Sequence, residues 1–279
     1  MRFEYGWYEI DIGIGIYKQT SSASMIFDSL HNYVFGVDDI EKKIQFGHPY
    51  APYCIVSFYI IFCKWIGPAL MVDRKPFELK NVLIFYNFFQ MIVNTYLTIK
   101  AVEGLLRMWN VRCEEYTTSP EMAVVVKDFD LALWHLYLIK YIDLFDAVFF
   151  VLRKKEKQIT FLHLFHHAVL CLICYIYLES LDIAFYLIVA LAINIFIHVI
   201  MYLYYFLSAF GPHMQKYLWW KRYLTTLQMI QFGIILMYMA VSFGTGCHKT
   251  GPMEISFFCF IAALLALFTN FYTKSFVNK

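Results

Sequence analysis

The sequence predicts an all-α integral membrane protein with seven transmembrane helices. Of its 279 residues, 61% are hydrophobic and 16% are charged, whereas a typical soluble domain carries about 25% charged residues. Seven stretches are long and apolar enough to cross a bilayer, and no internal repeat or linker marks off a second domain. The net charge is +2 and the chain has no basic tract, so the sequence does not indicate nucleic acid as a partner. Membrane lipid is an expected partner.

The expected spans follow one another along the chain, each with about 20 mainly apolar residues. The segments 1–49 and 101–130 are polar enough to lie outside the membrane. The predicted spans are 50–71, 81–100, 131–152, 160–178, 183–209, 223–243 and 255–273.

Basic residues orient the chain, because short cytosolic segments are enriched in lysine and arginine. Twelve of them lie in the segments after spans one, three and five and in the C-terminal tail. On the other side, the loop 179–182 has none and the loop 244–254 has only Lys249. We therefore expect a lumenal N-terminal segment over 1–49, a membrane domain over 50–273 and a cytosolic tail over 274–279.

Polar residues gather in four of the spans, which is costly in hydrocarbon unless they pair or serve a function. The segments are "KYIDLFD", "HLFHH", "NIFIHVIMYLYY" and "TTLQMIQF". If these residues are considered one at a time, several of them can be explained by an ion pair, by helix packing or by hydrogen bonds between helices. A shared polar cavity explains all four segments at once. The three histidines of "HLFHH" lie on adjoining parts of one helix face and would be its reactive centre.

Together the four segments resemble the motifs of the fatty acid elongase family, the condensing enzymes that extend very long chain acyl-CoAs. "HLFHH" matches HxxHH, "NIFIHVIMYLYY" matches NxxxHxxMYxYY, "TTLQMIQF" matches TxxQxxQF, and "KYIDLFD" stands in the place of KxxExxDT. The similarity runs from about residue 70 to the end, and "FGPHMQKYLWWKRYLT" resembles the animal very-long-chain subgroup.

The resemblance implies that spans two to seven surround a narrow tunnel closed towards the lumen, with span one packed outside. It implies condensation of an acyl-CoA with malonyl-CoA through an acyl-imidazole, giving a 3-ketoacyl-CoA two carbons longer, CO2 and CoA. No cofactor or metal is expected. The reductases and dehydratase of the elongation cycle are expected partners, and the sequence leaves a homodimer open. Residence in the endoplasmic reticulum is implied by the family alone, because the tail "SFVNK" has no dilysine retrieval signal.

Residue roles are carried over from the motif matches. His166 is expected to attack the thioester, because a neutral imidazole can form an acyl-imidazole. His198 would orient or polarise the donor, with Asn194 fixing its ring, while His163 and His167 would set tautomer and orientation. Supporting charge and hydrogen bonds would come from Lys140, Asp143, Asp146, Tyr202, Gln228 and Gln231. CoA phosphates would meet Lys154, Lys155, Lys216, Lys221 and Arg222, although the charge rule for cytosolic segments also explains these five.

Two positions depart from the family pattern. Asp143 and Ala147 stand where KxxExxDT has glutamate and threonine. A carboxylate is therefore shortened by one methylene, and a hydroxyl is lost. Because the main histidines are intact, we expect these changes to affect rate or substrate preference.

Two other classes of protein fit the sequence less well. A di-iron membrane desaturase or hydroxylase also uses histidine boxes, but the nine histidines here are widely scattered and include only one cluster, which is a poor supply of metal ligands. A seven-span receptor or transporter fits the span count, but not the polar stripes that gather with histidines on spans three to six. Bound iron would favour the first class, and signalling without turnover of acyl-CoA would favour the second.

Cysteine positions predict one disulfide. Of seven cysteines, Cys113 and Cys247 fall in loops that are lumenal in the predicted topology, where disulfides form and persist. We therefore expect a Cys113–Cys247 bridge at the lumenal end of the bundle. Cys171 and Cys174 have CxxC spacing but lie in an apolar span, where free cysteine packs as a small hydrophobic residue.

Overall fold

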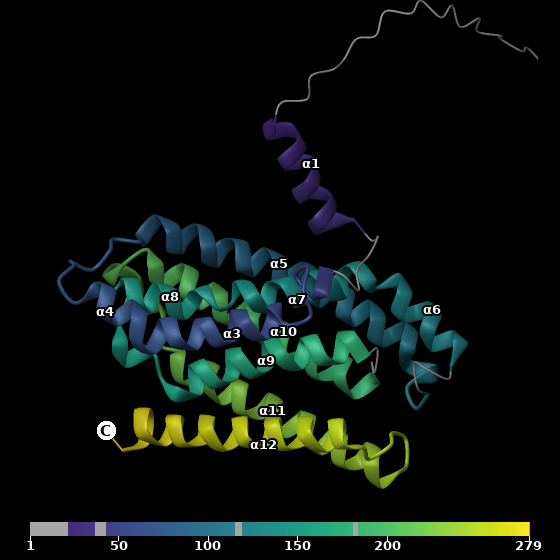
Figure 1. Cartoon of the computed structure of the whole chain (residues 1–279). Helices are drawn as coiled ribbons and strands as arrows, with labels where there is room; N and C mark the ends of the chain where they lie inside the picture. The colour runs from purple at the N-terminus through teal and green to yellow at the C-terminus, as the bar shows by residue number, and fades with distance from the viewer. Residues whose placement is uncertain (1–21, 37–42, 115–118, 181–183, 279) are drawn as a thin grey trace, which may run out of the picture. The chain divides into compact units, whose positions relative to one another are not determined.

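The computed structural model describes residues 22–36, 43–114, 119–180 and 184–278, and every regular element in those ranges is helical (Figure 1). The chain forms two compact units, residues 1–36 and residues 37–279. In the first unit, α1 (Ser22–Phe35) is the described helix. Residues 1–21 and 37–42 of the predicted N-terminal segment lie outside the described residues.

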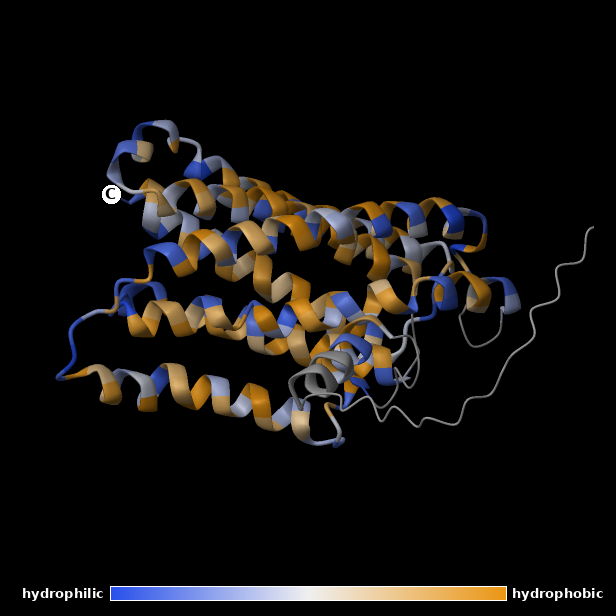
Figure 2. Ribbon diagram, turned by 90° about the horizontal axis from the view of Figure 1, so that it is seen from above, coloured by the Kyte–Doolittle hydropathy of each residue, from blue (hydrophilic) through white to orange (hydrophobic). Residues whose placement is uncertain are grey.

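The second unit is a bundle of helices that are apolar over most of their length, with polar residues towards their ends (Figure 2). Short 3-10 and π-helical turns join or extend several of them. The α-helices are α3 (Ala51–Ile61), α4 (Gly67–Met71), α5 (Lys80–Met108), α6 (Pro120–Asp128), α7 (Asp130–Ile142), α8 (Phe145–Leu152), α9 (Phe161–Ser180), α10 (Phe185–Ala209), α11 (Lys221–Gly244) and α12 (Pro252–Tyr272). The short turns are η1 (Phe62–Ile66), η2 (Trp109–Val111), η3 (Glu156–Gln158), η4 (Pro212–Tyr217) and η5 (Thr273–Val277).

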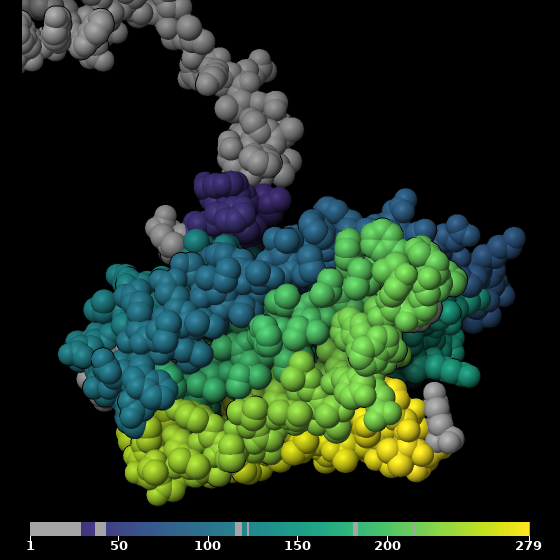
Figure 3. Space-filling view, turned by 180° about the vertical axis from the view of Figure 1, so that it is seen from behind, coloured from purple at the N-terminus to yellow at the C-terminus, as the bar shows by residue number. Residues whose placement is uncertain are grey.

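Six elements of this unit pack neighbour to neighbour in a ring. Helix α5 packs against α10, α10 against α11, and α11 against α12; Figure 3 shows these four side by side, from blue to yellow. Helix α12 then packs against α9, α9 against α7, and α7 against α5. Helix α3 packs against α9, and α4 packs against α8. The ring therefore has an interior that α7, α9, α10, α11 and α12 can line together.

In the part of the chain that the structure describes, six helical stretches are long and apolar enough to cross a membrane, so the protein is a helical, multi-pass membrane protein, as predicted. Their ends lie close to the predicted ones except in the second, which continues to Val111 instead of ending at residue 100. The reason is local: residues 101–108, "AVEGLLRM", include alanine, leucine, glutamate, arginine and methionine, which are strong helix formers. The six are Ala51–Met71, Lys80–Val111, Phe161–Ser180, Phe185–Ala209, Lys221–Gly244 and Pro252–Val277.

The third predicted span, 131–152, is not one helix. A turn at Asp143 and Leu144 divides it into α7 and α8. Two carbonyls at this turn accept hydrogen bonds from side chains of neighbouring helices. The Sγ of Cys171 lies 3.2 Å from the carbonyl oxygen of Lys140, and the hydroxyl of Tyr86 lies 3.2 Å from that of Ile142. The break is thus satisfied by polar groups, and it sets Asp143 at the end of α7.

Close packing of α4 on α8 depends on a glycine, and we expect Gly67→Ala to destabilise the bundle. A Cβ atom at Gly67 would lie 2.6 Å from Cγ1 of Val151 and 2.9 Å from the carbonyl oxygen of Phe62. Overpacking costs about 1–3 kcal/mol, which should exceed the roughly 1 kcal/mol that alanine gains over glycine inside a helix. The midpoint of thermal unfolding in detergent should therefore fall.

Gly233→Ala in α11 is the matched control for this substitution. A Cβ atom there would meet nothing within 4 Å. The helix-propensity gain should then act alone, and the unfolding midpoint should stay or rise. An unfolding midpoint for Gly67→Ala equal to that of Gly233→Ala would contradict the proposed role of Gly67.

Candidate active site

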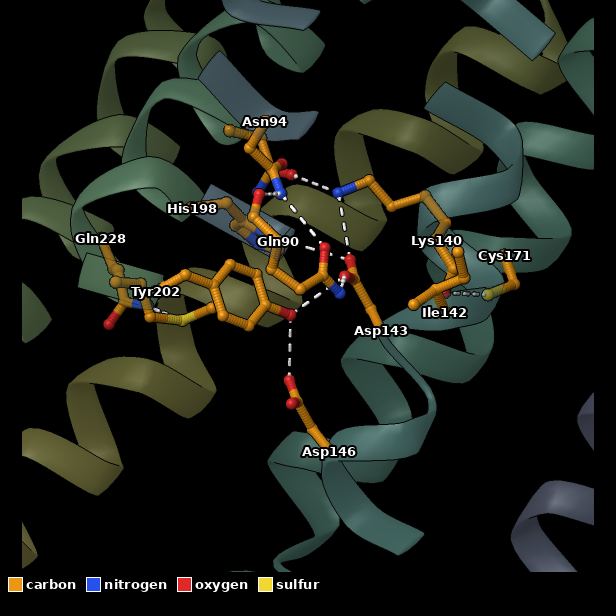
Figure 4. A network of polar contacts seen from close by, with 12 residues as sticks. Gln90, Asn94, Lys140, Ile142, Asp143, Asp146, Cys171, His198, Tyr202 and Gln228 are labelled. Atoms are coloured by element: carbon orange, nitrogen blue, oxygen red, sulfur yellow. Dashed lines mark hydrogen bonds and ion pairs between the residues drawn. The ribbon is translucent and has the colours of Figure 1, made fainter. Parts of the chain in front are cut away.

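A buried carboxylate, Asp143, is the centre of the polar network at the turn between α7 and α8 (Figure 4). Its Oδ1 accepts hydrogen bonds from Nε2 of Gln90 at 2.8 Å and from the hydroxyl of Tyr202 at 3.0 Å. Its Oδ2 lies 3.4 Å from Nζ of Lys140, and both side chains of this ion pair are 1% exposed. Side chains of α5, α7 and α10 therefore hold one anion together, as a buried charge requires.

Lys140 extends the network to Asn194 on α10. Its Nζ lies 3.2 Å from Oδ1 of Asn194. The ammonium group, and not the ring of His198, is thus the contact that orients this amide. The Nδ1 of His198 has no hydrogen-bond partner among the described residues.

Tyr202 joins two carboxyl groups. Its hydroxyl lies 3.0 Å from Oδ1 of Asp143 and 3.0 Å from Oδ2 of Asp146. A phenolic hydroxyl carries a single hydrogen, so the two carboxyl groups share one donor. A continuous chain of polar contacts therefore runs from Asp146 through Tyr202 and Asp143 to Lys140 (Figure 4).

The histidines of α9 lie close together in the bundle. Ring centroids are 4.5 Å apart for His163 and His167 and 5.1 Å apart for His166 and His167. On α10, Nδ1 of His198 is 3.7 Å from Oδ2 of Asp143, which is too long for a hydrogen bond. Nε2 of His163 is also buried without a hydrogen-bond partner among the described residues.

His166 lines a cavity in the interior of the ring, which we call the active-site cavity. It encloses about 740 Å³ of empty space, part of it open to the surroundings, between α7, α9, α10, α11 and α12. Asn194 and Gln231 line it together with His166, and Oε1 of the buried Gln231 has no hydrogen-bond partner among the described residues. Most other lining side chains are apolar, among them Leu136, Leu170, Leu191, Ile235, Phe260 and Leu264. The arrangement suits a long apolar guest with one reactive polar end.

Helix α5 contributes polar groups that the motif matches did not identify. Gln90 and Asn94 are fully buried, and Nδ2 of Asn94 lies 2.8 Å from the carbonyl oxygen of Gln90. Nε2 of Gln90 also lies 3.0 Å from the hydroxyl of Tyr86. A signal was present in the sequence, because Asn87, Gln90 and Asn94 recur at helical spacing within an apolar span.

Gln90 donates a hydrogen bond to Asp143, whose side chain is one methylene shorter than the glutamate of the family pattern. We expect the lengths of the Gln90 and Asp143 side chains to be coupled. Asp143→Glu should crowd the Gln90 amide, and Gln90→Asn should leave the carboxylate short of a donor. Each single change should cost about 1.5–3 kcal/mol of stability, as expected for a hydrogen bond to a charged group. The double variant, which keeps the summed length of the pair, should recover most of this loss.

The measurement is a double-mutant cycle of unfolding in detergent, with turnover measured on the same samples. Gln228→Asn is the matched control, because Nε2 of Gln228 contacts only the soft acceptor Sδ of Met201, at 3.9 Å, among the contacts described. Its effect should be smaller than that of Gln90→Asn. Additive losses in the double variant would show that Gln90 and Asp143 do not position each other.

The basic residues predicted to meet CoA lie at the ends of helices and in connecting turns. Nζ of Lys154 donates to the carbonyl oxygen of Val72 at 2.9 Å and so ties the turn after α8 to the turn after α4. Lys216 and Arg222 are exposed and lie over the rings of neighbouring tyrosines, 4.8 Å and 5.2 Å from the ring centroids. Lys155 and Lys221 are also exposed. Four of the five are therefore open to an anionic ligand.

Cys113 and Cys247 form a disulfide, with their Cα atoms 4.6 Å apart. It joins the chain just after η2 to the loop between α11 and α12. Cys171 and Cys174 are buried free thiols, and Cys174 lines the active-site cavity. Among the described residues, no three histidine, cysteine, aspartate or glutamate side chains are placed to hold a metal ion.

Membrane-length helices around a mostly apolar cavity that is lined by a histidine fit a multi-pass membrane enzyme that acts on an apolar substrate. The ELO model, described as the GNS1/SUR4 family, matches residues 44–279. Very long chain fatty acid elongase 4 of Mus musculus is 37% identical over 232 residues, which cover 82% of this chain and 72% of the relative. Very long chain fatty acid elongase 7 of Rattus norvegicus is 36% identical over 247 residues, 86% of this chain and 85% of the relative. Very long chain fatty acid elongase F of Drosophila simulans is 34% identical over 252 residues, which cover 88% of this chain and 94% of the relative.

The chain therefore belongs to the GNS1/SUR4 family, the fatty acid elongases. It is a condensing enzyme of fatty acid elongation, and the class predicted from the four motifs is confirmed.

Proposed function

We propose that this elongase is a very-long-chain 3-oxoacyl-CoA synthase. It condenses an acyl-CoA with malonyl-CoA and releases a 3-ketoacyl-CoA two carbons longer, CO2 and CoA. The observation that carries the proposal is that His166 lines a cavity whose other walls are mostly apolar. An acyl chain in that cavity would hold its thioester carbonyl beside a nucleophilic imidazole.

The cavity is proposed to be the interior of a tunnel formed by six spans, with α7 and α8 together making one of them. Helix α3, η1 and α4 would form the seventh span, packed outside. The neighbour-to-neighbour packing of the ring supports this arrangement. At the far end of α9 from His166, the hydroxyl of Tyr177 lies 3.3 Å from that of Tyr186 and 3.3 Å from the carbonyl oxygen of Met253. These contacts would close the tunnel at its lumenal end.

The CoA moiety would remain at the opposite, cytosolic end. The basic residues after α4, after α8, before α11 and in the tail lie at that end of the predicted topology, and those that are exposed would meet its phosphates. The N-terminus would be lumenal and the C-terminus cytosolic, in the membrane of the endoplasmic reticulum. The disulfide agrees with this orientation, because both its cysteines would then face the oxidising lumen.

Catalysis would proceed in two steps. A neutral imidazole nitrogen of His166 attacks the thioester carbonyl, the C–S bond breaks, and the departing CoA thiolate takes up a proton. Malonyl-CoA then loses CO2, and its carbanion attacks the acyl-imidazole. The C–N bond breaks and the departing imidazole nitrogen takes up a proton, which restores the free histidine and releases the 3-ketoacyl-CoA. The Asn194 amide, held by Lys140, and the Gln231 amide line the same cavity and would bind the polar groups of the reactants.

The proposed step needs no cofactor, because both reactants are thioesters and the loss of CO2 drives carbon–carbon bond formation. Its product carries a 3-keto group, so reductases and a dehydratase must act next and are the proposed partners. A homodimer is compatible with the proposal and is not required by it.

The test is incubation of the purified protein with malonyl-CoA and a series of saturated acyl-CoAs of rising length, followed by mass analysis of the products. We expect 3-ketoacyl-CoAs two carbons longer than each accepted substrate, with release of CO2. A hydroxylated or desaturated product of unchanged length, or binding without turnover, would contradict the proposal.

A further inference from the structure

A second apolar cavity lies beside the active-site cavity, and we call it the side cavity. It is bounded by α5, α6, α7 and α10 and encloses about 510 Å³ of empty space, part of it open to the surroundings. Lys100 is the only charged side chain among its lining residues, and its Nζ is paired with Oε2 of Glu103 at 2.9 Å. The condensation described above uses none of this space.

One layer of aliphatic side chains separates the two cavities. Leu133, Leu136, Ile188 and Leu191 line both of them. These side chains form no hydrogen bonds, so none would break if the layer opened. Rotation between staggered side-chain conformations would be enough to change the space that the leucines fill.

A glycine keeps part of the side cavity empty. Gly104 lies inside α5, where glycine is less favourable than alanine. A Cβ atom at this position would meet only the ring of Phe129, at 3.9 Å, which is an ordinary contact. Packing therefore does not require glycine here. Any larger side chain at position 104 would occupy the side cavity, which Gly104 lines together with Ala101 and Ala132.

We propose that the side cavity receives the distal end of acyl chains too long for the active-site cavity, and that these chains pass between Leu133, Leu136, Ile188 and Leu191. The inference rests on the proposed function, because it takes the occupant to be the acyl chain of the substrate. The end of a saturated acyl chain has no polar group, which matches the nearly uniform apolar lining. A membrane lipid would bring a headgroup, and Lys100 is already paired with Glu103.

The test measures kcat/KM for each acyl-CoA of a saturated length series. Gly104→Leu fills the side cavity and should lower kcat/KM for the longest accepted substrates by about 10-fold or more, the scale on which a pocket discriminates by methylene groups. Shorter substrates should be elongated at wild-type rates. Leu136→Ala removes part of the layer between the two cavities. It should raise kcat/KM for the longest substrates relative to kcat/KM for the shorter ones.

Gly233→Leu is the matched control, because it adds the same side chain on an exposed position of α11. Its length profile should equal that of the wild-type protein. Unchanged length profiles in both Gly104→Leu and Leu136→Ala, or a loss that is equal at every length, would overturn the inference and assign the side cavity to packing or to a membrane lipid. A wild-type protein that elongates no acyl-CoA would instead remove the proposed function itself.

Discussion

Replacing His166 by alanine should reduce condensation by roughly 10³-fold or more, because loss of a nucleophile removes the step through which all turnover passes. The protein should still fold, since the imidazole lines a cavity and, among the described residues, forms no hydrogen bond that holds two helices together. The measurement is the rate of 3-ketoacyl-CoA formation from a saturating acyl-CoA, with thermal unfolding in detergent as the test of folding.

His48→Ala is the control for this loss, because His48 is an exposed histidine before α3 and outside the active-site cavity. It should keep the wild-type rate. His163→Ala should lower the rate less than His166→Ala, because His163 does not line the cavity. A folded His166→Ala protein with a rate near that of wild type would show that another residue attacks the thioester.

Lys140→Met should destabilise the protein by about 3–5 kcal/mol, the scale for breaking a buried ion pair by removing one partner. The loss is expected because the 1% exposed carboxyl group of Asp143 would be left buried without the nearby ammonium group. Activity should fall as well, since Asn194 loses the contact that orients its amide. Unfolding and turnover measured on the same preparation give both quantities.

The double variant Lys140→Met with Asp143→Leu separates structure from catalysis. Removing both charges should restore most of the stability, because no uncompensated ion remains in the apolar interior. Turnover should stay low, because the groups that position Asn194 and Tyr202 are gone. Recovery of turnover together with stability would show that the ion pair serves folding alone.

Apolar length and the polar motifs predicted most of the fold, because a membrane span needs about 20 apolar residues whatever its tertiary contacts. The turn at Asp143 was not predictable in this way. Residues 131–152 are apolar on both sides of it, and the freed carbonyls are satisfied by Cys171 and Tyr86 from other helices. The packing of the helices decides which residues lie close enough to donate hydrogen bonds to the freed carbonyls.

The polar site was predicted only in part, for a similar reason. Histidines in an apolar span stand out. The helical spacing of Asn87, Gln90 and Asn94 in α5 is a weaker signal, and it does not reveal that Nε2 of Gln90 lies 2.8 Å from Asp143. Asn194 was expected beside His198, which is one turn away on the same helix, yet its Oδ1 lies against Lys140 of another helix. The side cavity leaves no sequence pattern at all, because Gly104 and the shared leucines come from separate helices.

The most direct test of the central claim is mass analysis of the purified wild-type protein after exposure to acyl-CoA without malonyl-CoA. The account predicts release of one CoA for each active site and an acyl group mapped to His166, which later addition of malonyl-CoA removes as 3-ketoacyl-CoA. His166→Ala protein should carry no acyl group. An acyl group on another residue, equal acylation of folded His166→Ala protein, or CoA release only after malonyl-CoA is added would contradict it.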